Sequence, residues 1–467
     1  MRVSHATAAV KPVFDDPNLV SCAGLAPLLI LAERAGLHRL VAEHVRLGAP
    51  GGVFPQVKVP ALVAGMVAGA DSIDDMDLLR HGGMDRLFTG IRAPSTLGIF
   101  LRAFTFGHVR QLDAVAARFV ANLARVTPLL PGAGAGGLAY LDVDDTVKAT
   151  YGYTKAGAGH GYTGVKGLNA MLGTVSTPLA APVIVASRLR RGAANSARGA
   201  ARLVADALAT AARMGADPAA GSLVIVRADS AFYGQPTVAA ARRAGARFSI
   251  TARQTPTVRR AITTIDPNGW TPIHYPNAFV DPDTGELVSD AEVAEIPFTA
   301  FTGRRAGGQV TARLIVRRVK RLNPAGMPAG QGELFTVWRY HACFSDSPLP
   351  MLDAEVAHRG HAIIEQVHAD LKNGPLAHLP CASFAANSAW LVLAVIAFNL
   401  TRAAGTLAST LHARATTGTI RAQLITVPAR LAHSARRLSI HLPSDWPWQA
   451  AWQQLFNAAV HPPPAIG

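Results

Sequence analysis

Hydrophobic residues recur every three or four positions through the first 130 residues, which is the spacing of one face of an α-helix. The segments LAPLLILAERAGLHRLVAEHV and TLGIFLRAFTFGHVRQLDAVAARFVANLARV carry this pattern with few turn-forming residues. We therefore predict a helical N-terminal region over residues 1–130. Within it, ADSIDDMDLLRHGG and APSTLGIFLRAF predict a short pair of helices. The pair either binds in a DNA groove or only packs against the rest of the fold.

The pattern changes after the glycine-rich linker TPLLPGAGAGG, where short apolar or alternating runs take turns with helical segments. The order of these segments is β-β-β-α-β-α-β, which predicts a mixed sheet covered by helices over residues 137–252. The strands and helices are expected, in order, in GLAYLDVDDT, GYTGVKGLNAMLGTVS, LAAPVIVASRLR, ANSARGAARLVADALATAARMG, GSLVIVRADS and GQPTVAAARRAGARFSIT.

Turn signals separate short strand candidates over residues 253–333, and we predict a β-rich insertion there. Strand and helix character then resumes, so residues 334–405 are expected to complete the sheet domain. Its helix AWLVLAVIAF is ten residues long, shorter than the ~18 residues that span a bilayer, which predicts a buried core helix. The last segment, residues 406–467, is basic and predicted to be helical.

The charge balance narrows the choice of partner. The formal net charge is +15, and a protein so far from neutrality attracts polyanions, with nucleic acid the first candidate and a membrane surface the second. The three cysteines are far apart and odd in number, so they predict neither a disulfide framework nor a metal-binding pair. No apolar run follows the basic residues of the N-terminus, and we expect a cytoplasmic protein.

The segment AHRGHAIIEQVHADLKNG (357–374) predicts an amphipathic helix. At 100° per residue its polar side chains fall within roughly one quarter of the circumference, opposite an aliphatic face. A solvated surface is the usual meaning of such a face, so a functional interpretation needs an independent partner. The polar residues are His358, His361, Glu365, His368 and Lys372, and the aliphatic ones are Ile363, Ile364, Val367 and Leu371.

Carboxylates at the ends of two apolar strands supply that partner. The period of two puts Asp142 and Asp144 on one face of LAYLDVDDT, and Asp229 ends LVIVRADS. Acidic residues there are costly unless something cationic lies beside them. Asp144, Asp229 and Glu365 come from two strand ends and one helix, and three such carboxylates suit hard divalent ions. Two such ions activate an attacking oxygen in displacement at phosphorus. The residues leave open whether Asp142 or Asp145 takes the place of Asp144 as the metal ligand, and the strand period allows Asp142 on the same face.

These motifs, LDVDDT, GYTGVKGLNAML, RADSAFYG and the polar helix, resemble the DDE transposases of bacterial insertion sequences, which have a ribonuclease-H-like core. The resemblance implies an α/β fold, with a ribonuclease-H-like mixed sheet flanked by helices, a β-rich insertion and an N-terminal helical DNA-binding region. It also implies that Asp144, in the D-x-T pattern, Asp229 and Glu365 are catalytic and hold two Mg²⁺ ions, for which Mn²⁺ substitutes.

Many members of the family carry on this helix a Tyr, two residues, an Arg, three residues, the Glu, six residues and a Lys. The same spacing here gives His358, His361, Glu365 and Lys372, so Glu and Lys match while Tyr and Arg are replaced. The family's Arg and Lys hold backbone phosphates, which suits a permanent cation, whereas a histidine is charged only part of the time near neutrality. Arg359 is a candidate to compensate.

One aromatic residue of the insertion is a further candidate for DNA contact. In the family an aromatic residue of the insertion can stack on a base flipped out near the transposon end, and Trp270 is the candidate for that role here. The alternative is that Trp270 packs the small core of the insertion.

The function implied is metal-dependent cleavage of element ends and strand transfer by an insertion-sequence transposase. Its partners would be double-stranded DNA, both terminal inverted repeats and target, and a second copy of the chain in a homodimer, with no membrane. It would work in the bacterial cytoplasm at the nucleoid. The alternatives are a catalytically inactive, transposase-derived DNA-binding protein and a ribonuclease-H-like nuclease without strand transfer.

Overall fold

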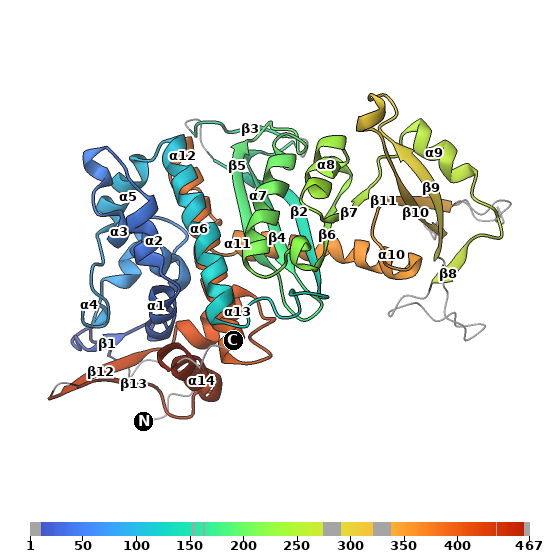
Figure 1. The fold of residues 1–467 in the computed structure, drawn as a ribbon. Helices are drawn as coiled ribbons and strands as arrows, with labels where there is room; N and C mark the ends of the chain where they lie inside the picture. Colours follow the sequence, from blue (N-terminus) through green and yellow to red (C-terminus); the bar gives the residue numbers. More distant parts are fainter. Residues whose placement is uncertain are drawn as a thin grey trace, which may run out of the picture.

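The computed structural model describes residues 11–151, 155–161, 164–273, 291–320, 338–435 and 437–461. Figure 1 shows a helical block at one end, a long sheet through the middle and a β-rich part at the other end. The chain runs from the helical block through the sheet to the β-rich part, and then returns, so that its last segment lies against the helical block.

The N-terminal block confirms the helical prediction. Its longest helix buries one apolar face, and Thr105 begins that helix with a reciprocal bond to His108. The segment ADSIDDMDLLRHGG forms a 3₁₀ helix, Asp74–Leu79 (η2), rather than an α-helix. The helices are α1 (Leu25–Arg34), α2 (Leu37–His44), α3 (Pro55–Ala68), α4 (Met84–Leu87), α5 (Pro94–Arg102) and α6 (Phe106–Val126).

The central sheet confirms the predicted order β-β-β-α-β-α-β. Its first three long strands are antiparallel, and the next two run parallel to the first, in the order β5-β4-β2-β6-β7. This is the mixed α/β sheet flanked by helices that a ribonuclease-H-like fold requires. The elements are β2 (Leu138–Ala149), β3 (Gly159–His160), β4 (Lys166–Ser176), β5 (Val183–Arg191), α7 (Ala200–Arg213), β6 (Leu223–Ala228), α8 (Gln235–Arg243) and β7 (Arg247–Thr251).

The insertion extends this same sheet, because β11 pairs with β7 and the insertion strands follow it to a total of ten. One helix there, α9 (Pro256–Thr263), was not predicted. Thr255 and Pro256 form the N-terminus of this helix. Because Thr and Pro also occur in turns, these two residues alone do not distinguish the start of a helix from a turn. The turns DPDTG and NPAGMPAGQG lie outside the described residues. The strands are β8 (Thr271–Ile273), β9 (Ala291–Ala300), β10 (Val310–Lys320) and β11 (Trp338–Ser345).

The single helix predicted over AHRGHAIIEQVHADLKNG is wrong. The chain instead forms α10 (Met351–Arg359), a 3₁₀ turn at Gly360–Ala362 (η7) and α11 (Ile363–Lys372). A Cβ atom at Gly360 would lie 2.8 Å from Nη1 of Arg227, so a larger residue there would displace that guanidinium. The interruption places His358 and His361 on different elements.

The buried core helix is confirmed and is longer than AWLVLAVIAF. Helix α12 (Phe384–Ala408) is buried along nearly all of its length and lies beside α6 (Figure 1). Among the described residues it alone has the length and composition of a membrane span, but 94% of its most apolar window is buried within the fold. Its Asn399 bonds the backbone of Ile184 on the edge strand β5.

The helical prediction for residues 406–467 is wrong in its middle part. There the chain forms a hairpin, because β12 pairs with both β13 and the short N-terminal strand β1 (Leu19–Val20). Pairing with a strand about 400 residues away is a tertiary contact that a local pattern does not report. The elements after α12 are α13 (Thr417–Ile420), a π-helical turn at Arg421–Ile425, β12 (Ala429–Ser434), β13 (Arg437–His441) and α14 (Gln449–Val460).

Candidate active site

Three acidic side chains meet where β2 and β6 lie side by side. Asp142 and Asp144 occupy the same face of β2, as the period of two predicts. Asp142 lies directly across from Arg227 of the parallel strand β6, and Val143 lies across from Ala228, the last residue of that strand. The next residue, Asp229, therefore lies beside Asp144. Its carboxylate accepts a 2.9 Å hydrogen bond from the backbone N–H of Ala231 and begins a short 3₁₀ turn.

Asp144 and Asp229 are both poorly solvated. Burial raises the pKa of Asp144 to about 7; a backbone hydrogen bond and His361 oppose the rise, and the charges of Asp229 and Asp145 add to it. Burial likewise raises the pKa of Asp229. Two neighbouring carboxylates that are held away from water are costly as anions, and a bound cation would offset that cost. The pair therefore fits a divalent metal ion with oxygen ligands.

Asp142 has a different environment. It is completely buried, and its two oxygens accept hydrogen bonds of 2.7 Å from Nε and Nη2 of Arg227. Nδ1 of His361 lies 3.1 Å from the same carboxylate. The sequence left open which aspartate of β2 is the candidate metal ligand. Asp144 is favoured over Asp142, because both oxygens of Asp142 already accept hydrogen bonds within the protein, while Asp144 faces Asp229.

Asp145 points to the opposite face of the sheet. Its carboxylate accepts hydrogen bonds from the side chains of Arg190, Asn169 and Ser196, and the residue is buried. Those partners belong to the neighbouring strands β4 and β5 and the loop that follows them. Asp145 therefore holds the sheet together and is not presented to the same side as Asp144.

The two histidines that replace the family's Tyr and Arg are both held inside the protein. His358 lies between the hydroxyls of Ser249 and Thr251, at 3.0 and 2.9 Å from its two ring nitrogens. Burial lowers the pKa of His358 to about 4, so the ring is neutral at pH 7. It is not presented to a DNA phosphate here. His361 instead lies beside Asp142, in the 3₁₀ turn η7 that precedes α11.

Helix α11 brings the remaining motif residues close to β2. Nζ of Lys372 donates a 2.6 Å hydrogen bond to the hydroxyl of Thr146, two residues after Asp144. Glu365 is exposed. His368 departs from the predicted solvated face, because it is buried, with Nε2 3.5 Å from an oxygen of Asp144 and without a hydrogen-bond partner. Burial lowers the pKa of His368 to about 3, so it too is neutral.

The described residues do not bring the three predicted metal ligands into one cluster. Among them, no three His, Cys, Asp or Glu side chains lie close enough to hold a metal ion. The structure thus brings Asp144 and Asp229 together, whereas Glu365 lies on the exposed side of α11, one helical turn after His361.

The other two predicted DNA-contacting residues have partners within the protein. Nε of Arg359 donates to both carboxylate oxygens of Glu355 at 2.9 Å, one turn earlier on α10. The guanidinium of Arg318 lies over the ring of Trp270, with Cζ 4.2 Å from the centroid, and also over the ring of Trp338, at 4.4 Å. Trp270 therefore packs within the insertion, as the second interpretation of this residue predicts, although its side chain remains partly exposed.

Arg227 is the site residue that sequence reasoning missed. It lies on an otherwise apolar strand, on the same face as Asp229, and it is only 3% exposed. A basic residue within a buried strand needs a charged partner, and the acidic residues of β2 were the available ones. The need of a buried basic residue for a charged partner could therefore have identified Arg227 from the sequence.

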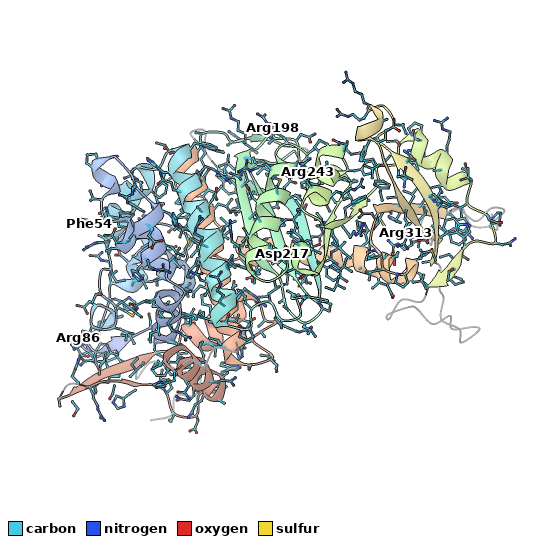
Figure 2. The ribbon with its side chains drawn as sticks, in the orientation of Figure 1. Phe54, Arg86, Arg198, Asp217, Arg243 and Arg313 are labelled. Atoms are coloured by element: carbon cyan, nitrogen blue, oxygen red, sulfur yellow. The ribbon has the colours of Figure 1, made fainter. Side chains whose placement is uncertain are left out.

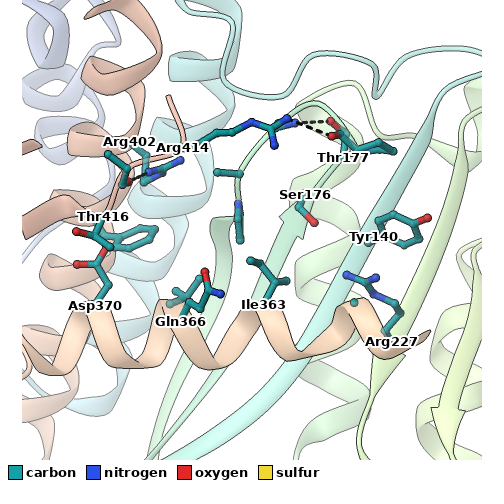
Figure 3. Close-up of a pocket in the computed structure, with 18 residues that line it drawn as sticks. Tyr140, Ser176, Thr177, Arg227, Ile363, Gln366, Asp370, Arg402, Arg414 and Thr416 are labelled. Carbon is teal, nitrogen blue, oxygen red and sulfur yellow. Dashed lines mark hydrogen bonds between the residues drawn. The ribbon is translucent and has the colours of Figure 1, made fainter. Parts of the chain in front are cut away.

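A cavity of about 360 Å³ lies on the other side of α11 from Glu365. Figure 3 shows Ile363 of α11 below Ser176 of the sheet, and Asp370, further along the helix, beside Thr416. Arg227 lines this cavity and also donates a hydrogen bond to Asp142.

Comparison with known proteins adds one finding. A sequence model described as transposase DDE domain group 1 matches residues 4–461, nearly the whole chain. A search of curated proteins gave no match.

Proposed function

The chain belongs to the transposase DDE domain group 1 family, and from this premise we propose that it is an insertion-sequence transposase. It cuts DNA at the ends of its element and joins the freed strand to a target. The observation that carries the proposal is the pairing of Asp144 and Asp229 at neighbouring strands, where burial raises the pKa of both. Perturbed carboxylates of this kind are typical of catalytic centres.

Asp144 and Asp229 would hold divalent metal ions, Mg²⁺ or Mn²⁺, together with Glu365 as the family's third carboxylate. Two such ions would stabilise the attacking and leaving oxygens during displacement at phosphorus. Lys372, fixed by Thr146 next to Asp144, provides a cation that can bind a DNA phosphate at the cut. Of the residues in the family's helix motif, Lys372 is the one whose position best supports a phosphate contact.

The DNA partner is supported by charge. The net charge is +15, and exposed arginines lie over separate parts of the surface, as Figure 2 shows for Arg86, Arg198 and Arg243. A long DNA segment that crosses several elements would release many counterions on binding. The chain would act at the bacterial nucleoid, as a homodimer that holds the two inverted repeats of the element.

The experiment is cleavage and strand transfer on a labelled duplex carrying the element's end, with magnesium or manganese. Asp229→Ala is expected to abolish both products while leaving DNA binding intact. Asp217→Ala is a matched control, because Asp217 also begins a 3₁₀ turn and accepts a 3.0 Å bond from the N–H two residues later. Cleavage that survives in Asp229→Ala would contradict the proposal.

A catalytically inactive DNA-binding protein is the second candidate. The observation that favours it is the loss of the family's phosphate-holding Arg, since His358 is buried and His361 is bonded to Asp142. The same assay separates the candidates. An inactive protein binds the element end without any product, a nuclease without strand transfer gives only cut DNA, and a transposase gives joined DNA as well.

A further inference from the structure

Helix α11 lies along the face of β2 that carries Asp144. Near the middle of the helix, Nε2 of His368 lies 3.5 Å from an oxygen of Asp144. At the last residue of the helix, Nζ of Lys372 donates a 2.6 Å hydrogen bond to Thr146, two residues further along the strand. The helix and the strand therefore run in the same direction, and the helix ends level with Thr146.

Lys148 is the next residue on that face, because side chains two residues apart on a strand point to the same side. At about 3.4 Å per strand residue, its Cα lies roughly 7 Å beyond that of Thr146. The charges of the two lysines interact, since burial and the charge of Lys148 lower the pKa of Lys372, while Asp144 raises it. Two cations therefore follow Asp144 along this face of β2.

Lys148 has no partner within the protein that explains its position. Among the described residues its side chain makes no hydrogen bond and no ion pair. Burial lowers the pKa of Lys148, and the charge of Asp71 opposes that effect. The carboxylate of Asp71, however, lies 2.8 Å from Nδ1 of His378. A half-buried cation beside a second cation is unfavourable, and an anion bound by both would offset that cost.

A structural role at the end of α11 is the competing explanation for Lys148. A cation at that place can bind the last carbonyl groups of a helix. Here the carbonyl oxygens of Ala369 and Leu371 already accept hydrogen bonds from backbone N–H groups. The strand end is also accessible, because β6 pairs with β2 only as far as Val143, and Lys148 is half-buried. Lys148 is therefore left to an anion from outside the chain.

We propose that Lys148 and Lys372 together bind the backbone of one DNA strand, with Lys372 at the phosphate of the cut and Lys148 at the neighbouring phosphate. A lysine binds a phosphate as a point charge, and two in a row follow a strand past the reaction centre. His361 stands where the family has its Arg, and it lies 3.1 Å from Asp142. Lys148 supplies the second cation from the strand instead. The inference rests on the proposed function, which makes DNA the substrate.

The test measures DNA binding by the full chain without divalent metal, so it does not depend on cleavage. The probes are labelled duplexes carrying the element's end, each with one uncharged methylphosphonate in place of a phosphate. An uncharged group at a contacted position is expected to weaken wild-type binding about tenfold, the effect of losing one charged hydrogen bond. Fluorescence anisotropy measures this penalty position by position.

Lys148→Gln is expected to bind the unmodified duplex about tenfold more weakly and to lower the salt slope by about one. It is also expected to remove the methylphosphonate penalty at one position only. Lys372→Gln is expected to remove the penalty at the adjacent position. A structural defect would instead weaken binding and leave the penalty at every position.

Two further variants make the result specific. Lys155→Gln is the matched control, because Nζ of Lys155 already donates to the carbonyl oxygen of Leu379, and it is expected to keep every penalty. Lys148→Arg keeps the charge and is expected to keep both the affinity and the penalty. Thermal unfolding of each variant confirms folding, and Lys148→Ala decides the matter if Lys148→Gln does not fold.

The outcomes separate this inference from the proposed function. Penalties that persist at every position in Lys148→Gln overturn the role of Lys148, while the transposase stands, because Asp229-dependent cleavage tests it separately. A penalty removed at a position distant from that of Lys372 also overturns it. If no methylphosphonate weakens binding of the wild type, the proposed DNA contact at the element's end fails, and the inference fails with it.

Discussion

Asp142 and Asp144 lie two residues apart on one face of β2, but their carboxylates have different environments. Asp142 is fully buried and doubly bonded to Arg227, whereas Asp144 faces Asp229 and an unpartnered nitrogen of His368. A residue type and a strand period do not distinguish these two environments. The difference arises from one arginine on the neighbouring strand.

Breaking the Asp142–Arg227 pair is expected to destabilise the protein. Asp142→Ala leaves the guanidinium of Arg227 buried without its partner, which costs about 3–5 kcal/mol of unfolding free energy. Urea denaturation measures the change. The double variant Asp142→Leu with Arg227→Met is the control, since removing both charges is expected to recover most of the loss. Equal instability of the single and double variants would contradict this account.

His358 is expected to make the fold sensitive to acid. The pKa of His358 in the folded protein, about 4, lies below its unfolded value near 6.5. Its stabilising contribution is therefore present above pH 6.5 and is lost as the pH falls towards 4, because the unfolded chain binds the proton first. The loss reaches about 3 kcal/mol. His358→Gln is expected to flatten the stability profile between pH 6.5 and 4, measured by thermal unfolding.

At the scale of elements, α12 closes the outer edge of the sheet. The side chain of Asn399 accepts a 2.9 Å bond from the N–H of Ile184 and donates a 2.7 Å bond to its carbonyl oxygen. An amide side chain thus replaces the missing neighbour strand of β5, which would otherwise leave an unpaired edge. The buried helix therefore stabilises the sheet through hydrogen bonds as well as through packing.

Removal of that amide is expected to weaken the junction between α12 and β5. Asn399→Ala leaves two buried backbone groups of Ile184 without partners, at about 1–3 kcal/mol each. The free energy of unfolding in denaturant measures the loss. Asn457→Ala on the exposed side of α14 is the control and is expected to change stability by less than about 0.5 kcal/mol. A similar effect of both changes would contradict the edge-closing role.

At the scale of the whole molecule, ends and insertions join the central fold through strand pairing. The insertion strands continue the central sheet from β7, and the C-terminal hairpin pairs with β1 near the N-terminus. The N-terminal helices, the sheet and the β-rich part therefore form one elongated body (Figure 1). Under the proposed function, this elongated body would present a long surface to DNA.

Binding to DNA is expected to weaken steeply with salt. With a net charge of +15 and basic residues on many elements, a contact with roughly six to ten phosphates loses about 10³–10⁵ in affinity between 50 and 200 mM salt. Fluorescence anisotropy with a labelled duplex measures the slope. Asp229→Ala is expected to keep the wild-type slope, because it alters the reaction centre and leaves the surface cations in place. A shallow slope in both proteins would argue against a phosphate-dominated interface.

The sequence by itself determined the strands and helices of the central sheet and the face of Asp142 and Asp144 on β2, and those predictions are confirmed. It also carried the motifs that place the chain in its family. Period and end signals are local, and in β2, β4, β6 and α7 the local preference agrees with the final packing. The assignment of Glu365 as a metal ligand stays a prediction.

Only the tertiary structure decided which carboxylate is free, where the polar helix breaks and which of its histidines are buried. Arg227 bonds Asp142 and lies close to Gly360, and both contacts join residues more than 80 positions apart in the chain. The C-terminal hairpin of β12 and β13 likewise pairs with β1, a strand about 400 residues earlier in the chain. These features depend on contacts between segments that are distant in the sequence. A periodic pattern does not predict such contacts, because it reflects only residues that are close along the chain.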